Sequence, residues 1–249
     1  MNEQKLLITV PSQLCGDMKY FLDESAASVV HAPLESFTYT TEKLASNLLR
    51  DNLHSFAFVV YGNVLQATYF EQWISENDLL DDIRNLVHFT LDQPTSDFLE
   101  LHGIPAIQPR ENARPIDILE FMLRISREGK TLYPSCANRA EEMPGLLEEL
   151  EMEVAEFTVC EEVGLTQDEL ETLRDTVAQA DINAVLFHNR SAVTRAFAAF
   201  PDLNFKKMEI YSGSAGVTEH LISKGIELNY EAGGSWHSIE ELIREKYLA

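Results

Sequence analysis

Small polar residues gather in four turns where this chain could bind an anion. Residues 62–64 and 189–191 follow apolar runs, and residues 92–95 and 212–218 open predicted helices. Backbone N–H groups at helix N-termini bind anions, and open α/β sheets bind ligands beyond the carboxyl ends of their strands. These turns are therefore candidate ligand sites, whose main-chain amides and side-chain hydroxyls could donate to an anion.

Four side chains near these turns have two possible roles each. His188 could act as a general acid, because its ordinary pKa is near neutral, or it could be a packed histidine. Arg139 opens an acidic helix, where it either binds an anion or forms a surface ion pair. Thr95 and Ser214 fit N-terminal helix caps, a role that does not exclude ligand binding.

The elements that would position these residues occur twice in the chain. Residues 57–63 correspond to residues 184–190 at an offset of 127, and residues 95–104 correspond to residues 217–226 at an offset of 122. A period this long is too large for a solenoid repeat. It predicts two similar α/β domains.

Connectivity suggests how the two domains share the chain. Strands are predicted near residues 5–11 and 27–33, before the first repeat, and they need a sheet to join. We expect an α/β fold of two similar domains, each a parallel sheet flanked by helices, joined by a two-stranded linker with a cleft between them. The predicted boundaries are residues 1–35 with 163–249 for one discontinuous domain, 41–155 for an inserted domain, and 36–40 and 156–162 for the hinge linkers.

Composition excludes several classes of protein. A net charge of −22 over 249 residues argues against binding nucleic acid or an anionic membrane surface. No apolar run approaches the ~18 residues of a membrane span, and the N-terminus does not resemble a signal peptide. The cysteines Cys15, Cys136 and Cys160 have no paired spacing, so we expect packed thiols and a cytoplasmic location. No zinc or nucleotide motif is present.

Five segments, taken in order, resemble one enzyme family. Residues 7–11 resemble an opening strand ending T-R-P, and residues 186–193 with Phe197 resemble F-T-S-x-S-A-V. Residues 92–103 and 212–225 each resemble G-x-x-T-A-x-x-x-L-x-x-x-G, and residues 132–139 resemble a strand and turn ending in arginine. Together they are similar to uroporphyrinogen-III synthases over nearly the whole chain. The sequence departs from the family pattern at four positions: Val10 for Arg, Asp92 for Gly, Cys160 for Tyr and Val217 for Thr.

The resemblance implies a cyclising lyase of tetrapyrrole and heme biosynthesis. Its substrate would be hydroxymethylbilane, converted to uroporphyrinogen III with loss of water and inversion of ring D. It implies a cytoplasmic monomer that needs no metal or cofactor, with this small molecule as its partner. The alternative is a catalytically impaired protein of the same fold that binds a tetrapyrrole or another polycarboxylate. Val10, Cys160 and Val217, which stand where the family prefers polar groups, would be consistent with this alternative.

The substrate carries eight carboxylates, which the four turns would hold, with two arginines adding charge. His188 is the candidate catalytic residue. The candidate substrate-binding residues are Thr9, Tyr61, Gly62, Asn63, Thr95, Arg139, Asn189, Arg190, Ser191, Ser212, Gly213 and Ser214.

Overall fold

The computed structural model describes residues 5–14, 29–110, 115–125, 128–137, 142–233 and 236–246. The chain divides into two compact units, and each is described by itself. Unit 1 comprises Met1–Ser36 and Val163–Ala249, and unit 2 comprises Phe37–Glu162. The chain therefore passes from one unit to the other twice.

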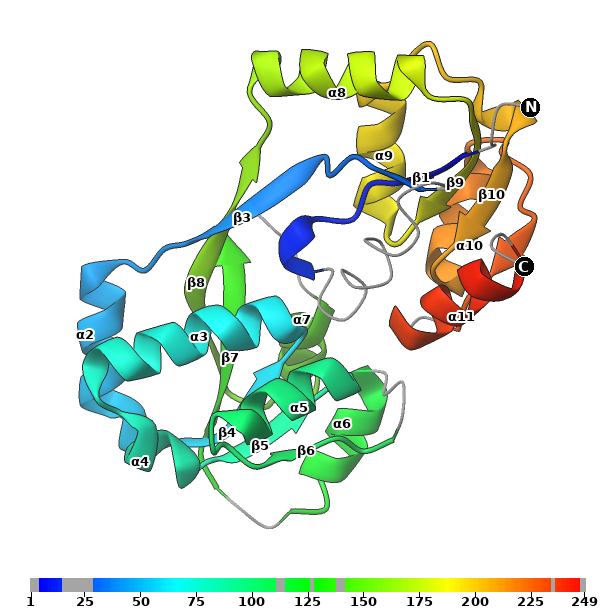
Figure 1. The fold of residues 1–249 in the computed structure, drawn as a ribbon. Helices are drawn as coiled ribbons and strands as arrows, with labels where there is room; N and C mark the ends of the chain where they lie inside the picture. The colour runs from blue at the N-terminus through cyan, green and yellow to red at the C-terminus, as the bar shows by residue number, and fades with distance from the viewer. Residues whose placement is uncertain are drawn as a thin grey trace. The chain divides into compact units, whose positions relative to one another are not determined.

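Unit 1 contains a five-stranded parallel sheet in the order β11-β10-β9-β1-β2 (Figure 1). Two strands from the start of the chain thus join three from its end. This happens because β1 pairs with β9 over Leu6↔Ala184, Leu7↔Val185 and Ile8↔Leu186. The bounds are β1 Lys5–Ile8, β2 Val29–His31, β9 Ile182–Phe187, β10 Glu209–Ser212 and β11 Tyr230–Glu231.

Helices cover the unit 1 sheet and bury its apolar side chains. Parallel strands are covered on both faces, which explains why β9 ends in a run of four buried residues. The core includes Leu7, Val185, Phe187, Val193 and Leu221. The helices are η1 Ser12–Leu14, α8 Gln167–Gln179, α9 Arg190–Ala199, η3 Phe205–Lys207, α10 Ala215–Ser223 and α11 Trp236–Lys246.

Unit 2 is built on a six-stranded sheet in the order β3-β8-β7-β4-β5-β6. The five strands from β8 to β6 are parallel. Hydrogen bonds join Ser36 to Val163 and Thr40 to Val159, so β3 runs antiparallel to β8. The bounds are β3 Glu35–Tyr39, β4 Phe56–Tyr61, β5 Val87–Thr90, β6 Ala106–Ile107, β7 Lys130–Ala137 and β8 Val154–Gly164.

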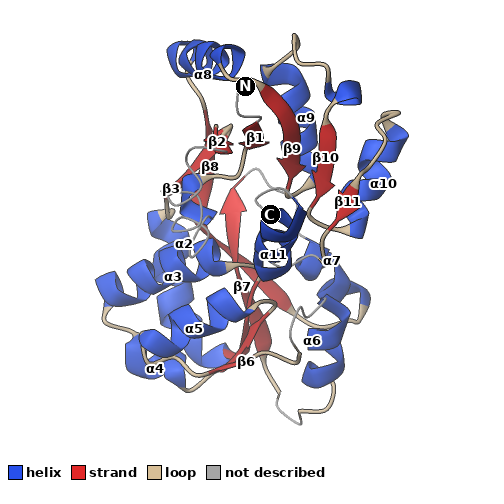
Figure 2. Ribbon diagram, turned by 45° about the vertical axis from the view of Figure 1, so that its right-hand side comes forward, coloured by secondary structure: helices blue, strands red, loops and turns tan. Residues whose placement is uncertain are grey.

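The direction of the crossovers assigns the helices of unit 2 to two faces. The chain moves from β4 to β5 to β6 in one direction and from β6 to β7 to β8 in the other. Right-handed connections then put α3 and α5 on one face and α6 and α7 on the other, and each pair of helices is in contact (Figure 2). The bounds are α2 Lys43–Asn52, η2 Leu53–Ser55, α3 Val64–Asn77, α4 Leu80–Arg84, α5 Gln93–Leu101, α6 Pro115–Met122 and α7 Glu142–Glu149.

The two units end corresponding helices in the same way. Gly103 follows α5 with φ 74°, and Gly225 follows α10 with φ 71°. The next residue donates its N–H back to the carbonyl of Leu99 or Leu221, respectively, at 2.9 and 3.1 Å. A left-handed glycine with this bond is a common helix C-terminus. The offset of 122 residues predicted from the sequence is therefore confirmed here.

The other predicted offset, 127, is wrong by one residue. The last strand residues are Tyr61 in β4 and Phe187 in β9, and the helix caps that follow are Asn63 and Asn189. Both differences are 126. The two apolar runs remain similar when their alignment is shifted by one residue, whereas the cap residues Asn63 and Asn189 align only at an offset of 126. His188 therefore corresponds to Gly62, in the turn, and not to Tyr61.

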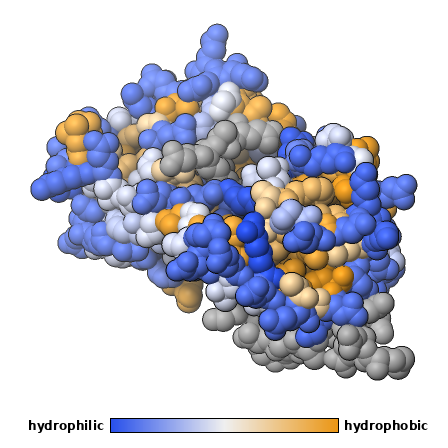
Figure 3. Space-filling view, turned by 90° about the horizontal axis from the view of Figure 1, so that it is seen from above, coloured by the Kyte–Doolittle hydropathy of each residue, from blue (hydrophilic) through white to orange (hydrophobic). Residues whose placement is uncertain are grey.

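Hydrophilic side chains cover much of the face of the molecule shown in Figure 3. Within the described parts of the chain, no helix combines the length and hydropathy that crossing a membrane requires.

Candidate active site

Each sheet has one place where the strand connections change direction. In unit 1 it lies between β9 and β1, because β9 leads to β10 on one side and β1 leads to β2 on the other. In unit 2 it lies between β4 and β7 by the same reasoning. Open α/β sheets bind ligands at the carboxyl ends of strands at such switch points. Thr9 and His188 lie there in unit 1, and Gly62 lies there in unit 2.

The turn after β4 is held by its own helix. Asn63 caps α3 by accepting the N–H of Gln66 at 3.1 Å, and Gln66 Oε1 accepts the N–H of Gly62 at 2.7 Å. Tyr133 reaches the same turn from β7, since a Cβ on Gly62 would lie 2.6 Å from its hydroxyl. The Gly62 amide is thus already used, and the amides left to meet a ligand are those of the first residues of α3.

Tyr61 supports this turn from below. Its side chain is fully buried, and its hydroxyl lies 3.2 Å from Nδ1 of His88. His88 Nε2 lies 2.8 Å from the carbonyl oxygen of Ile83, so Nε2 carries the proton and Nδ1 accepts from Tyr61. Burial lowers the pKa of His88 to about 4, against a smaller opposing effect of the Ile83 bond. The Tyr61 hydroxyl is therefore committed to His88.

A second turn of unit 2 follows β5, the strand beside β4. Asp92 caps α5, with Oδ1 accepting the N–H of Thr95 at 2.9 Å. The prediction that Thr95 caps this helix is therefore wrong, because Thr95 is its third residue. Thr90 pairs in register with Tyr61, and its hydroxyl is buried without a hydrogen-bond partner among the described residues. Burial raises the pKa of Asp92, while the hydrogen bond from the backbone N–H of Thr95 opposes the rise. This turn places a carboxyl group and two threonines together.

His188 in unit 1 is held by the next residue. Asn189 Oδ1 accepts the N–H of Ala192 at 2.7 Å, which fixes the amide so that Nδ2 lies 2.8 Å from Nε2 of His188. Because Nδ2 donates, Nε2 must be unprotonated and the imidazole neutral. The arrangement favours a neutral ring, and the role of His188 as general acid stays a prediction.

The turn after β10 presents hydroxyl groups. Ser212 is buried, with its hydroxyl donating to the Ser214 carbonyl at 2.9 Å, and Ser214 begins α10 without a side-chain cap bond. Gly213 is tightly packed, because a Cβ there would lie 3.0 Å from the Cα and the carbonyl oxygen of His188. Thr9, beyond β1, has a buried hydroxyl that finds no partner among the described residues. The Ser214 hydroxyl is therefore not used to cap α10.

Arg190 and Ser191 lie at the first turn of α9, beside α10. Arg190 Nε donates to the Gly216 carbonyl at 2.9 Å, and its guanidinium is 3.8 Å from Glu219. A pocket of about 280 Å³ between these helices is lined by Arg190, Ser191, Thr194, Arg195 and His220. The other predicted arginine, Arg139, falls outside the described residues, so its surroundings stay a prediction.

Sequence comparison decides the family. The model of the family described as Uroporphyrinogen-III synthase HemD matches residues 18–243, which is most of the chain. The chain belongs to the uroporphyrinogen-III synthase family. It is therefore a lyase of heme biosynthesis, as the ordered segments predicted, and the impaired binding protein is not favoured. No curated protein sequence matches the chain.

Solved structures of uroporphyrinogen-III synthases share its fold. The enzyme from Helicobacter pylori is 15% identical, with a TM-score of 0.64 over 97% of this chain and 99% of that one. A mutant enzyme from the extremely thermophilic bacterium Thermus thermophilus is 8% identical, with a TM-score of 0.65 over 97% and 96%. At such identities the likeness supports the α/β fold with parallel sheets and says nothing of individual site residues.

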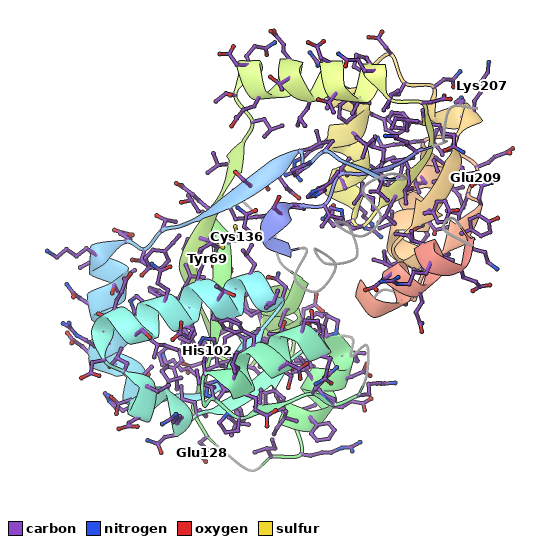
Figure 4. The ribbon with its side chains drawn as sticks, viewed as in Figure 1. Tyr69, His102, Glu128, Cys136, Lys207 and Glu209 are labelled. Carbon is purple, nitrogen blue, oxygen red and sulfur yellow. The ribbon has the colours of Figure 1, made fainter. Side chains whose placement is uncertain are left out.

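Two of the three cysteines of this synthase are described, and both are buried free thiols. Cys136 and Cys160 are register partners on β7 and β8. Tyr69 on α3 lies close enough to both thiols for their charges to raise its pKa, after the larger effect of burial (Figure 4). Cys15 falls outside the described residues. Within the described ranges, no three potential metal ligands of the His, Cys, Asp and Glu types come together.

Sequence reasoning missed several residues that shape the synthase turns. One of them, Gln66, had a local signal, because a polar cap followed three residues later by Glu or Gln is a known pattern at helix starts. His88 and Tyr133 had no local signal in the sequence, since they reach Tyr61 and Gly62 from neighbouring strands. Asp92 was noted only as a departure from the family pattern.

Proposed function

We propose that this synthase holds the carboxylates of hydroxymethylbilane at the N-termini of α3, α5, α9 and α10. The observation that carries the proposal is the repetition of one arrangement in both units. Two neighbouring parallel strands each end in a turn, and each turn begins a helix, which an Asn or Asp side chain caps in α3, α5 and α9 but no side chain caps in α10. Each helix leaves its first amides unpaired within the helix, and these can donate to carboxylate oxygens.

Amides and hydroxyls suit this substrate better than the overall charge suggests. The chain carries −22, which repels a polyanion at long range. Repulsion between exposed charges is screened beyond roughly 8 Å at physiological salt. Local donors therefore decide the affinity, and the described turns supply Ser191, Ser214 and the first amides of four helices. Arg139 and Arg190 are proposed to add positive charge.

The reaction requires chiefly that the bound substrate be oriented correctly. The hydroxyl of the hydroxymethyl group leaves as water while its carbon stays on the pyrrole, and the resulting azafulvene is attacked so that ring D is inverted before the macrocycle closes. The bilane can also close unaided to the type I isomer. A ~100-fold preference for one closure corresponds to about 2.7 kcal/mol, which orientation of a bound substrate can supply.

A coupled assay tests the proposed substrate. Hydroxymethylbilane is generated enzymatically in the presence of the purified chain, and the products are oxidised and separated as type I and type III isomers. We expect mainly the type III isomer. A product ratio equal to that of the buffer control would contradict the proposal.

The hydroxyl of Ser214 offers a sharper test of the binding site. We expect Ser214→Ala to raise KM by about tenfold, because a hydrogen bond to a charged group contributes roughly 1.5 kcal/mol. Ser223→Ala is the matched control, since Ser223 lies at the other end of α10 and donates only to the His220 carbonyl. Equal KM values for the two variants would exclude Ser214 from the site.

We further propose a monomer that works in the cytoplasm without a cofactor and without nucleic acid as a partner. The free thiols of Cys136 and Cys160 support a reducing compartment. Light scattering coupled to size-exclusion chromatography tests the oligomeric state. A mass near twice the chain mass of 28.2 kDa would contradict it.

A further inference from the structure

Two cysteines of unit 2 lie side by side in its sheet. Cys136 on β7 and Cys160 on β8 are register partners in a parallel pair. Neighbouring strands of a sheet are about 4.8 Å apart, and the Cα atoms that a disulfide joins are roughly 4.4–6.8 Å apart. The strand pairing therefore already gives these two residues a separation that a disulfide can bridge.

The two thiols also lie close to shared neighbours. The Cys160 thiol is 3.9 Å from the carbonyl oxygen of Ser135, the residue that precedes Cys136 on β7. Burial is the largest cause of the raised pKa of Tyr69, and the charges of Cys160 and Cys136 add to it (Figure 4). Tyr69 belongs to α3, which contacts β7. Observations of different kinds thus place the two sulfur atoms near each other, beside α3.

The surroundings of the pair limit which reagents can reach it. Both thiols are reduced, Cys160 is fully buried, and Cys136 is 5% exposed. Tyr69 is held nearby, because its hydroxyl donates to the Phe37 carbonyl at 3.0 Å and its ring stacks on Tyr39. A bulky oxidant such as glutathione disulfide is therefore a poor match for this place. A small uncharged oxidant such as hydrogen peroxide fits it better.

We propose that Cys136 and Cys160 are a redox modification site, which hydrogen peroxide converts reversibly from two thiols to a disulfide. Cys136 reacts first, because it is the thiol with some exposure, and Cys160 then resolves the product. This inference does not depend on the proposed function.

The reaction has two steps. First the Cys136 thiolate attacks one peroxide oxygen, the O–O bond breaks, and the other oxygen leaves as hydroxide, which takes the thiol proton to become water. Cys136 is then a sulfenic acid. Next the Cys160 sulfur attacks the Cys136 sulfur, the S–O bond breaks as the S–S bond forms, and the hydroxyl leaves with the Cys160 proton as a second water. The two thiols lose two electrons, and the peroxide gains them.

The second thiol keeps the oxidation reversible. A sulfenic acid with no thiol beside it is oxidised further to sulfinic acid, which ordinary thiols do not reduce. A strand separation of about 4.8 Å is near the short end of the disulfide range, and strained disulfides are readily reduced. In a reducing compartment the pair would therefore be dithiol at rest and disulfide only transiently.

Peptide mapping tests the bond directly, because trypsin separates the three cysteines. Cys15 falls in the peptide of residues 6–19, Cys136 in residues 131–139 and Cys160 in residues 140–174. The folded chain is treated with hydrogen peroxide, its remaining thiols are alkylated, and the digest is analysed by mass spectrometry without reduction. We expect the second and third peptides joined, with a mass lower by two hydrogen atoms than their sum, and their separation by dithiothreitol. Oxidation that leaves these two peptides unlinked, or joins either to residues 6–19 instead, would overturn the proposal.

Two variants separate the roles of the thiols. Cys160→Ala should accumulate the sulfenic acid of Cys136, which dimedone traps on the peptide of residues 131–139, and should then form sulfinic acid. Cys136→Ala should be oxidised at Cys160 about tenfold more slowly than Cys136 is in Cys160→Ala, since Cys160 is fully buried. Cys15→Ala is the matched control, and it should form the same disulfide as the wild type.

Equal dimedone labelling of Cys136 in the wild type and in Cys160→Ala would refute Cys160 as the resolving thiol. The peptide map of the wild-type chain stays decisive if a variant fails to fold. Neither measurement involves turnover, so a failure here is distinct from a failure of the proposed function.

Discussion

Acidification should weaken unit 2 through one buried histidine. The pKa of His88 is lowered from 6.5 to about 4, mainly by burial. In the unfolded chain the residue binds a proton below pH 6.5, whereas in the folded chain it stays neutral down to about pH 4. The unfolded state therefore binds more protons between these values, and stability falls as the pH falls through that window.

The size of the effect follows from the two pKa values. One pKa unit corresponds to about 1.36 kcal/mol, so the complete change from pH 6.5 to about 4 amounts to about 3 kcal/mol. At pH 5.5 about 1.3 kcal/mol should already be lost relative to pH 7.5 by the same relation. This pH stays above the isoelectric point of 4.6, where a chain without net charge tends to precipitate.

Urea unfolding followed by tryptophan fluorescence measures the loss. The chain has two tryptophans, and Trp73 in unit 2 is buried between Phe70 and Phe157. Replacing Trp236 by Phe leaves Trp73 as the reporter for unit 2. Other groups titrate as well, and relief of repulsion among the acidic residues acts in the opposite direction. The comparison with His88→Gln isolates the histidine, since glutamine keeps a donor for Ile83 and does not titrate.

We expect the free-energy difference between the wild-type chain and His88→Gln to shrink by about 1.3 kcal/mol from pH 7.5 to pH 5.5. A difference that is the same at both pH values would mean that His88 is protonated equally in the folded and unfolded chains. The argument from burial would then be wrong.

Three further perturbations give expected outcomes. Gly213→Ala should lower the free energy of unfolding by ~1–3 kcal/mol, because its Cβ would lie 3.0 Å from backbone atoms. Gly145→Ala, whose Cβ would have no atom within 4 Å, should raise the free energy of unfolding by up to about 1 kcal/mol. Thermal denaturation of the two variants distinguishes these outcomes. Tyr61→Phe should cost about 1–3 kcal/mol in urea unfolding by leaving a ring nitrogen of His88 without its donor, and no loss would mean that water replaces the hydroxyl. The pKa of Asp92 is raised, so the folded chain binds that proton more tightly than the unfolded chain does. In unfolding experiments Asp92→Asn should therefore be no more stable than the wild type at pH 3 and gain in relative stability as the pH rises. A stability difference that does not change with pH would contradict the raised pKa.

Many elements were predictable because their signals are local. The sequence patterns predict strands at residues 56–61 and 87–90 and a helix at residues 167–179, and these are the bounds of β4, β5 and α8. The sequence pattern also predicts a helix over residues 116–127, but α6 ends earlier, at Met122. The short helix α4, Leu80–Arg84, was not predicted, because five residues are too few to show a helical period.

In the candidate site, too, only features that depend on local sequence could be predicted. Caps such as Asn63 and Asn189 could be found in the sequence, because an N-cap bonds to an amide three residues ahead. The sequence could not show which polar groups remain open to a ligand. Tyr61 looked available beside its turn, yet its hydroxyl donates to His88 on the neighbouring strand. His188 looked like an acid, yet the orientation of Asn189 favours its neutral form.

By itself, the sequence determined the order of most strands and helices, the duplication and the four turns, since each depends on residues close together in the chain. Only the tertiary structure decided the one-residue correction of the repeat and the environment of Asp92. Burial and hydrogen-bond partners depend on which strands become neighbours in a sheet. Parallel pairing joins segments as distant as β1 and β9, beyond the range of any local pattern.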